Sequence, residues 1–332
     1  MTKSATREAA DKVTFTQAEV TAGDTASRAG RKNLIINGSF QISQRGNYTS
    51  ATGLTSSWTY YLDRFKARIN NISGNLTHKV DQTVDGKLTD TVRLDATSTA
   101  SGYINLLQQF EDLQKLKGQS VTFSAWVKSN TTNAKLVLHR DGSNAQTATT
   151  HTGGGGWELL TATVTLATTI THSVGLYCGI LANATGNVSI TSGDYFEMAF
   201  VQLELGSVAT DFEHRSYGEE LALCQRYFYQ ETTRHYRPSF LDGSGNYPTV
   251  FVEHPVPMRV TATGAFLQAS DYYYNSSGSG DSNFIPNPSS VSWNGDNKGG
   301  SLRYNAISNG QGASNAMIVG IWYTRLKFDA EL

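Results

Sequence analysis

The 332-residue chain lacks a charge imbalance and long apolar runs, and each absence excludes a class of protein. Lys and Arg total 27 against 28 Asp and Glu, so the net charge is −1 and does not favour binding to nucleic acid or to anionic lipid. No stretch approaches the ~18 apolar residues of a membrane span, and residues 1–15 contain no apolar signal-peptide core. We therefore expect no nucleic-acid partner and no membrane insertion. We also expect the chain to be synthesised in a cytosol and to stay there until another component moves it.

Cysteine and the common catalytic motifs are also scarce. The two cysteines, Cys178 and Cys224, lie among apolar neighbours without metal-ligand spacing, which predicts free buried thiols. The seven histidines are scattered singly, so no zinc site is expected. H-E-x-x-H, G-x-S-x-G and the Gly-rich nucleotide loops are absent. The sequence thus predicts no metal, no cofactor and no enzyme.

A pair of carboxylates from distant strands is harder to exclude, because a glycosidase needs only two, roughly 5–10 Å apart. Five acidic residues lie close together in the sequence: Asp194, Glu197, Glu204, Asp211 and Glu213. The favoured interpretation is structural, with Glu204, Asp211 and Glu213 flanking turns, where carboxylates bind backbone N–H groups and pair with neighbours such as Arg215.

What the sequence does contain is a series of short runs rich in Val, Thr, Ile, Phe and Tyr, separated by Gly, Asn and Ser. No helical pattern is interleaved with them, so they predict an all-β fold, an antiparallel jelly-roll β-sandwich over residues 33–213. The predicted strands are NLIINGSF, DTVRLDA, GYINLLQQF, SVTFSAWVKS, AKLVLHR, WELLTATVTL, SVGLYCGIL, NVSIT and DYFEMAFVQLEL.

Residues 214–229, HRSYGEELALCQRYFY, instead predict one helix. Ser216 is a suitable N-cap and Glu219 completes a capping box. One stripe carries Tyr217, Leu221, Cys224 and Phe228, and a second carries Ala222, Leu223 and Tyr227. Two apolar faces favour a helix on the axis of a homotrimer, although both could instead pack between two domains of one chain. The predicted trimer interface comprises Leu221, Leu223, Cys224, Tyr227 and Phe228.

Composition divides the chain into four sections. Residues 1–32 hold too few large apolar side chains to close a core, which predicts an attachment arm. The jelly roll (33–213) and a linking helix (214–230) follow. Residues 231–332 are rich in β-forming residues and in Gly, Ser and Asn loops, and predict a small C-terminal β domain.

Two loops of that C-terminal domain combine aromatic rings with polar side chains, as sugar sites do. The candidate glycan-binding residues are Tyr272, Tyr273, Tyr274, Trp293, Asn294 and Asp296. The alternative is that the tyrosines are packed strand residues and that Trp293 fills the core of the domain. Within the sandwich we interpret four rings as core or edge packing rather than as a glycan platform: Trp58, Tyr60, Trp126 and Trp157.

Several longer segments together resemble a known family. They are NLIINGSFQISQRG, YLDRFKA, INLLQQFEDLQKLKGQSVTFSAWVKS, FVQLELGSVATDFEHRSYGEELALCQRYFYQ, PVPMR and the terminal FDAEL. In this order they are similar to bacteriophage virion proteins of the tail-fibre and tailspike type. In that family a carbohydrate-binding-module-like jelly roll precedes the ELALCQRY helix and a small β tip.

The resemblance implies a structural virion protein on the phage particle surface, without a catalytic centre. It implies a homotrimer that contacts other virion proteins through residues 1–32 and whose tip binds a host-receptor glycan. Two alternatives stay open, namely a capsid decoration, cement or head-fibre protein that stabilises the particle, and a depolymerase tailspike. Tail and head attachment are both compatible with the sequence.

Overall fold

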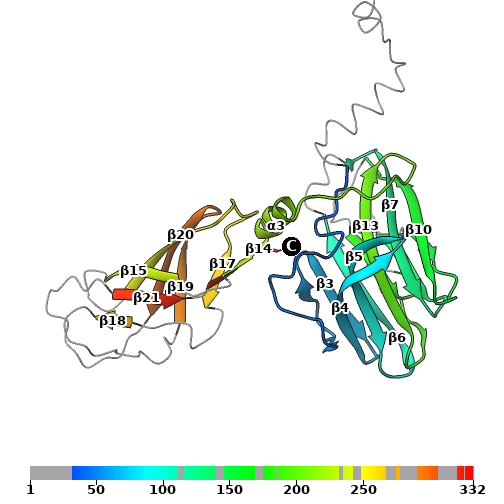
Figure 1. Ribbon diagram of the computed structural model, residues 1–332, viewed down its shortest axis with the longest axis horizontal. Coiled ribbons are helices and arrows are strands. Elements are labelled where there is room, and N and C mark those ends of the chain that lie inside the picture. The colour runs from blue at the N-terminus through cyan, green and yellow to red at the C-terminus, as the bar shows by residue number, and fades with distance from the viewer. Residues whose placement is uncertain are drawn as a thin grey trace, which may run out of the picture. The chain divides into compact units, whose positions relative to one another are not determined.

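The computed structural model describes eleven ranges of the chain, and they form two compact units (Figure 1). The jelly-roll unit comprises the chain up to Ser39, Ala51–Ser57 and Arg68–His214, and the C-terminal unit comprises Phe40–Ser50, Trp58–Ala67 and the chain from Arg215. The predicted arm lies outside the described residues, except for Lys32. The described ranges are 32–110, 116–139, 146–168, 175–183, 186–231, 235–241, 248–266, 274–276, 290–305, 320–324 and 326–331.

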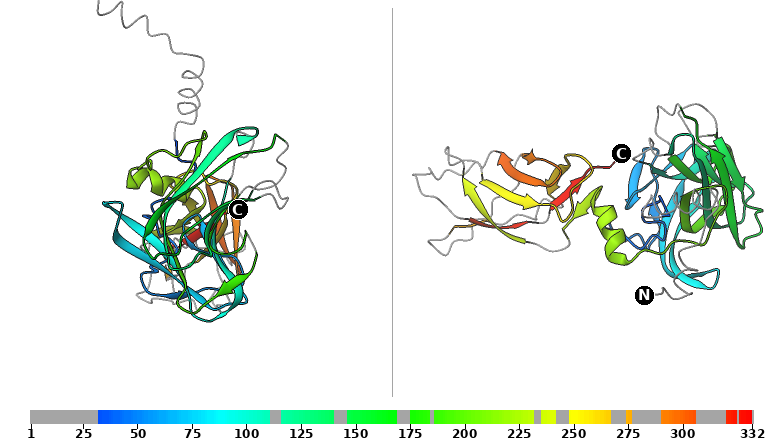
Figure 2. Two further views of the ribbon diagram at one scale, coloured as in Figure 1. Left: turned by 90° about the vertical axis from the view of Figure 1, so that its right-hand side faces the viewer. Right: turned by 90° about the horizontal axis from the view of Figure 1, so that it is seen from above.

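Two antiparallel sheets form the sandwich, as Figures 1 and 2 show, and the predicted all-β jelly-roll class is confirmed. The six-stranded sheet has the order β1-β4-β5-β13-β7-β10, and the other has the order β2-β3-β6-β11-β8-β9 with β12 paired to β6. The first sheet contains β1 (Thr52–Gly53), β4 (Gly74–Val84), β5 (Lys87–Ala96), β7 (Ser120–Ser129), β10 (Trp157–Thr165) and β13 (Tyr195–Leu205). The second contains β2 (Thr59–Leu62), β3 (Phe65–Asn70), β6 (Ala100–Gln109), β8 (Ala134–His139), β9 (Gln146–Thr150), β11 (Gly175–Ile180) and β12 (Val188–Ile190).

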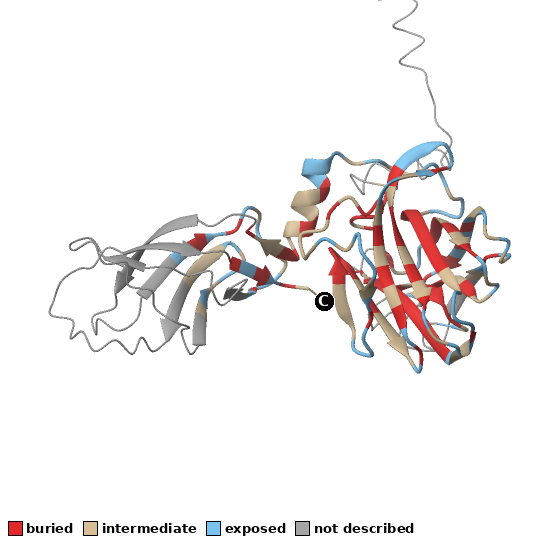
Figure 3. Cartoon of the chain, turned by 60° about the horizontal axis from the view of Figure 1, so that its bottom comes forward, coloured by how far each residue is buried: buried red, intermediate tan, exposed pale blue. Residues whose placement is uncertain are grey.

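Alternation along the strands places the core between the sheets, where Figure 3 shows the buried positions gathered in the strands. In β7, Phe123 and Val127 are fully buried, and Phe196 of β13 and Leu94 of β5 are buried beside them. Burying each such side chain contributes about 1.5–3 kcal/mol relative to exposure. This apolar face fixes the register of the sheet and thereby the position of every residue on the opposite face.

The predicted strand over residues 33–40 is wrong, because this segment is buried coil. Asn37 and Phe40 have φ angles of 62° and 57°, which lie outside the extended region that a regular strand adopts. Asn33 instead donates from Nδ2 to the carbonyl of Val201 at 3.0 Å, and Leu34 N–H donates to Leu203 O at 2.8 Å. The segment therefore lies along β13 through the side chain of Asn33 and isolated backbone hydrogen bonds rather than through a regular ladder.

The C-terminal unit is also β-rich, as predicted. One sheet has the order β14-β22-β17 and the other the order β18-β21-β15-β16-β20-β19. The unit also contains 40–50 and 58–67, which the predicted domain bounds assign to the jelly roll. Its strands are β14 (Phe228–Gln230), β15 (His235–Leu241), β16 (Pro248–Glu253), β17 (Thr263–Phe266), β18 (Tyr274–Ser276), β19 (Ser290–Gly295), β20 (Gly299–Asn305), β21 (Gly320–Thr324) and β22 (Leu326–Asp329).

The helix α3 (Tyr217–Gln225) begins where the sequence predicts. Its capping box is present, with Glu219 N–H donating to Ser216 Oγ at 3.3 Å and Ser216 N–H donating to Glu219 Oε2 at 3.3 Å. The predicted end near residue 229 is wrong, because Phe228–Gln230 pair with β22 as strand β14. Tyr217 is 60% exposed, so the predicted stripe does not hold at its first position.

Candidate functional site

The face of the six-stranded sheet that points away from the core carries a continuous row of polar and aromatic residues. Residues directly opposite each other in neighbouring strands point to the same face. Arg93 of β5 pairs with Thr77 of β4 and with Glu197 of β13. Glu197 in turn pairs with Lys128 of β7, which pairs with Trp157 of β10. Five strands that Figure 1 shows side by side thus contribute one residue each to this outer face.

Glu197 lies at the centre of the row and is only 2% exposed. Its Oε2 is 2.8 Å from Lys79 Nζ and 3.5 Å from Arg93 Nη1, and its Oε1 accepts a hydrogen bond from Thr91 Oγ1 at 2.9 Å. A buried carboxylate is tolerated when cations and hydrogen bonds compensate it, and these three partners do so. They also fix the two basic side chains in place, so the outer face is ordered before any ligand arrives.

Arg93 extends this network toward solvent. Its guanidinium carbon lies 3.9 Å from the ring centroid of Tyr195, and its Nε donates to Asp95 Oδ1 at 2.8 Å. The side chains of Arg93 and Asp95 are 25% and 29% exposed. Charged donors and acceptors are therefore held at fixed positions beside an aromatic ring.

Trp126 and Trp157 provide the apolar part of the outer face. Both are half-buried and pack against Ala199 and Phe200, which belong to a small apolar cluster on this side of the sheet. Trp126 pairs with Ala199, so it points away from the core, a point that the alternation of SVTFSAWVKS leaves open. Both rings thus pack against other side chains on the outer face and not between the sheets, and the expectation that they form no glycan platform stays a prediction.

Such a surface suits a polyhydroxylated ligand, because sugars present C–H groups to aromatic rings and hydroxyls to charged and amide groups. The sequence did not point to Arg93, Asp95 or Tyr195 as functional residues. It also did not show that the buried carboxylate of Glu197 is neutralised by basic side chains. Alternation within DTVRLDA indicates that Arg93 and Asp95 share a face. It does not reveal which strands lie next to β5, and the site exists only through that pairing.

The structure places the predicted glycan residues of the C-terminal domain in different surroundings. Tyr272 and Tyr273 lie outside the described residues, and Tyr274 is described only as the start of β18. Trp293 is half-buried, with its ring centroid 5.0 Å from that of Phe328, as in the packing alternative. Asn294 and Asp296 are exposed. Glycan binding by this set stays a prediction.

The five residues of the predicted trimer interface differ in how far they are buried within the single chain. Cys224, Tyr227 and Phe228 are between 0% and 3% exposed inside the C-terminal unit of a single chain. The guanidinium of Arg64 lies 3.5 Å from the Tyr227 ring centroid, and that of Arg45 lies 3.7 Å from the Phe228 ring centroid. Leu221 and Leu223 are half-buried, and the contact between chains stays a prediction for the predicted interface.

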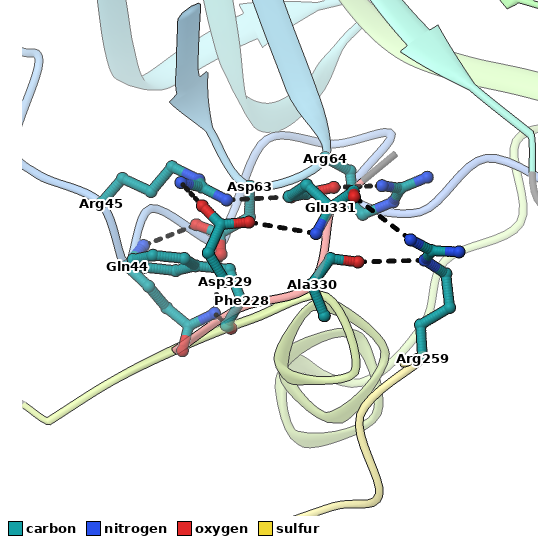
Figure 4. A network of polar contacts seen from close by, with 9 residues as sticks. All are labelled: Gln44, Arg45, Asp63, Arg64, Phe228, Arg259, Asp329, Ala330 and Glu331. Carbon is teal, nitrogen blue, oxygen red and sulfur yellow. Dashed lines mark hydrogen bonds and ion pairs between the residues drawn. The ribbon is translucent and has the colours of Figure 1, made fainter. Parts of the chain in front are cut away.

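Five of the segments that carry the family resemblance meet in one polar network, drawn in Figure 4, in which Arg259 of PVPMR donates to the backbone oxygens of Ala330 and Glu331. Glu331 of the terminal FDAEL bonds to Arg64 of YLDRFKA and, at 3.1 Å, to Nη2 of Arg45 of ISQRG. Gln44 joins the network to the residues after the helix by donating from Nε2 to Phe228 O at 2.9 Å. These segments therefore build the interior of the C-terminal unit.

Asp63 is a buried acid within this network. It accepts hydrogen bonds at 2.6 Å from both the backbone N–H and the side-chain Nε2 of Gln44. Burial raises the pKa of Asp63 to about 6, against the opposing effect of the two hydrogen bonds. The folded chain therefore binds this proton more tightly than the unfolded chain does.

We expect the stability of the wild type, relative to an Asp63→Asn variant, to fall as pH rises through the window from 3.8 to about 6. The raised pKa contributes stability that is fully present below the unfolded pKa and lost above the folded one. The relative loss should reach about 3 kcal/mol, with a slope of up to ~1.4 kcal/mol per pH unit. Urea unfolding of both proteins between pH 3 and 7 measures it. A constant offset between the two curves, without a difference in slope, would contradict the raised pKa.

Two of the three carboxylates predicted to flank turns, Glu204 and Glu213, bind backbone N–H groups, and both cysteines are buried, as predicted, whereas Arg215 Nη1 is 3.1 Å from Glu220 Oε1. Glu204 accepts from the backbone N–H of Thr210 at 2.8 Å, and Glu213 accepts from that of Asn33 at 2.6 Å. Both cysteines are free and buried, and burial raises the pKa of each thiol. Within the described ranges, His, Cys, Asp and Glu form no group of three that could hold a metal ion. None of the helices that the structure describes is long and apolar enough to cross a membrane.

No family model and no curated protein matches the chain. Among solved structures, the enzymatically active domain of bacteriophage CBA120 tailspike protein 4 is 14% identical with a TM-score of 0.33, and the match covers 52% of this chain but 21% of that one. A CBM4 structure is 16% identical with a TM-score of 0.31, covering 51% of this chain and 98% of that one. TmCBM61, solved with β-1,4-galactotriose, is 14% identical with a TM-score of 0.31, covering 53% and 99%. The chain is thus similar over about half its length to these structures, and TM-scores of this size carry no argument about its function.

Proposed function

We propose that this protein is a carbohydrate-binding structural protein of the phage particle surface, and that the outer face of the six-stranded sheet binds the sugar. The observation that carries the sugar site is the row Arg93–Glu197–Lys128–Trp157, with Tyr195 and Asp95 beside it. The virion part of the proposal is supported by the sequence segments that resemble tail-fibre and tailspike proteins.

The proposed mechanism is binding without a reaction. The buried Glu197 holds Lys79 and Arg93, so little side-chain entropy is lost when a sugar hydroxyl binds to the basic groups. In the proposed homotrimer, attached to other virion proteins through residues 1–32, three weak sites would raise the effective affinity by about 10²–10⁴. Such avidity suits a tail fibre or spike that meets a host surface glycan.

The test begins with the purified full chain on a glycan array, followed by calorimetric titration of the strongest ligand. Tyr195→Ala should lower the affinity at least tenfold, because the loss of one large ring contact costs about 1.5–3 kcal/mol. Asp95→Ala should also weaken binding, since it removes a partly exposed acceptor and leaves Arg93 less well oriented. Light scattering of the same samples gives the mass, and a single-chain mass would remove the trimer from the proposal.

Leu88→Ala is the matched control. Leu88 lies on β5 and is 71% exposed, but it stands an odd number of positions from Arg93 and Asp95, so its side chain points to the other face of the sheet. The variant should bind like the wild type. Equal affinities for Tyr195→Ala, Asp95→Ala and Leu88→Ala would exclude the outer face as the site. A wild type that binds no glycan would contradict carbohydrate binding and would favour a decoration protein that stabilises the particle.

A further inference from the structure

The charges around the row on the outer face do not balance. The row and the positions directly beside it on this face carry three cations, Lys79, Arg93 and Lys128. Among the described residues at these positions, the only carboxylates are those of Glu197 and Asp95. This part of the face therefore has one positive charge in excess.

Both carboxylates are bound by the same two cations. Glu197 Oε2 contacts Lys79 Nζ at 2.8 Å and Arg93 Nη1 at 3.5 Å, and its other oxygen accepts from Thr91 Oγ1 at 2.9 Å. Asp95 Oδ1 accepts from Arg93 Nε at 2.8 Å. Lys128 is therefore the cation in excess, although Glu197 stands directly opposite it in the sheet.

The acids that adjoin the face in the sequence do not neutralise Lys128 either. Glu158 Oε2 accepts from the backbone N–H of Thr152 at 3.1 Å, and Asp194 Oδ2 accepts from that of Thr191 at 2.9 Å. Within the described ranges, the ammonium of Lys128 forms no ion pair and no hydrogen bond. It is thus available to an anion from outside the protein.

The neighbours of Lys128 place its ammonium close to an aromatic ring. Lys128 is half-buried, directly opposite Trp157 of the edge strand β10 and two positions from Trp126 in β7. Lysine packs its aliphatic stem along apolar neighbours and keeps its charge in water. Opposite side chains of paired strands are about 5 Å apart at Cβ, so an anion bound to Lys128 lies next to Trp157.

Sugars that carry a carboxyl group match both features of this arrangement. In a uronic or a sialic acid the carboxylate is attached directly to the ring, whose C–H groups can pack on an indole. A hydrogen bond from an ammonium to a carboxylate is about twice as strong as one between neutral groups. We propose that the saccharide bound by the outer face is acidic, with its ring on Trp157 and its carboxylate on Lys128. This inference rests on the proposed function and makes Lys128 the residue that determines specificity.

Calorimetric titration of the full chain with matched pairs of oligosaccharides tests the charge of the ligand. The pairs are fragments of polygalacturonate, alginate and polysialic acid, each compared with the same fragment after reduction of its carboxyl groups to hydroxymethyl groups. The reduced forms keep the ring and lose the charge. The wild type should bind at least one acidic fragment at least tenfold more tightly than its reduced form, and high salt should lower this ratio by screening the exposed charge.

Variants of Lys128 test which residue sets the preference. Lys128→Met keeps the stem beside Trp157 and removes the charge, so it should bring the affinities for the acidic and the reduced form close to each other. Lys128→Arg keeps the charge and should retain the preference. Lys87→Met is the matched control, because Lys87 is exposed on the same face of β5, about 20 Å along the strand from Arg93. Loss of the same charge there should leave the ratio of the two affinities unchanged.

The outcomes separate this inference from the proposed function. Equal affinities of the wild type for the acidic and the reduced forms would overturn the acidic ligand and leave the sugar site on the sheet in place. A preference that Lys128→Met retains would overturn the assignment of the carboxylate to Lys128. A wild type that binds no glycan, acidic or neutral, would reject the proposed function as well. Melting temperatures close to that of the wild type show that the variants are folded.

Discussion

Replacing Glu331 by alanine is expected to lower the free energy of unfolding of the C-terminal unit by about 3–5 kcal/mol. The Glu331 side chain is 4% exposed and neutralises Arg64, which is 2% exposed, and Arg45, which is 10% exposed. Removing the carboxylate leaves Arg64 charged in a place where water cannot replace the lost partner. The guanidinium of Arg64, 3.5 Å from the Tyr227 ring centroid, would then keep its charge in a buried place without this carboxylate.

Asp329→Ala is the matched control for this measurement. Asp329 also contacts Arg45, at 3.2 Å, but its side chain is 45% exposed, so its loss should cost about 1 kcal/mol or less. Calorimetric or urea unfolding of the full chain gives both values. A double replacement, Arg64→Met with Glu331→Met, should recover much of the stability, because it removes both buried charges together. A cost for Glu331→Ala no larger than that for Asp329→Ala would show that the buried pair does not stabilise the unit.

The second large effect is expected from Gly179→Ala in the jelly-roll unit. Gly179 lies in β11, between β6 and β8. Its φ angle is 146°, which residues that carry a side chain rarely adopt. A Cβ atom there would be 2.2 Å from the carbonyl oxygen of Ile104 and 3.0 Å from Asn105 Cα. Both atoms are backbone, so the strands must separate. Backbone strain and overpacking together should cost about 4 kcal/mol.

Gly156→Ala provides the comparison, because a Cβ at Gly156 would meet nothing within 4 Å. Its unfolding free energy should stay within about 0.5 kcal/mol of the wild type. Thermal unfolding of the two variants under identical conditions measures the difference. Similar melting temperatures would mean that β6 and β11 can separate at little cost, contrary to the close approach in the structure.

Local chemistry in the sequence was sufficient to predict several elements. Ser216 and Glu219 set the start of the helix, because a capping box depends on residues only three positions apart. SVTFSAWVKS corresponds to β7 (Ser120–Ser129), since alternation over a run of this length indicates a strand. The burial of Cys178 and Cys224 followed in the same way from their apolar neighbours.

Elements whose state depends on distant partners were mispredicted. NLIINGSF has strand composition, yet positive φ at Asn37 and bonds from Asn33 to β13 keep it as coil. The helix ends early because Phe228 gains a partner in β22, about a hundred residues further along the chain. Local propensity does not include the free energy of these hydrogen bonds, since the partner strands β13 and β22 come from other parts of the sequence.

By itself, the sequence determined that this protein is all-β with one capped helix and that its cysteines are buried, because period, capping and local composition are encoded within a few residues. Only the tertiary structure decided which face Trp126 occupies, and that Arg93, Glu197, Lys128 and Trp157 form one row. It also decided that Arg64 meets Glu331, 267 positions away. Strand order and the pairing of buried charges depend on how the whole core packs, and no short stretch of sequence contains that information.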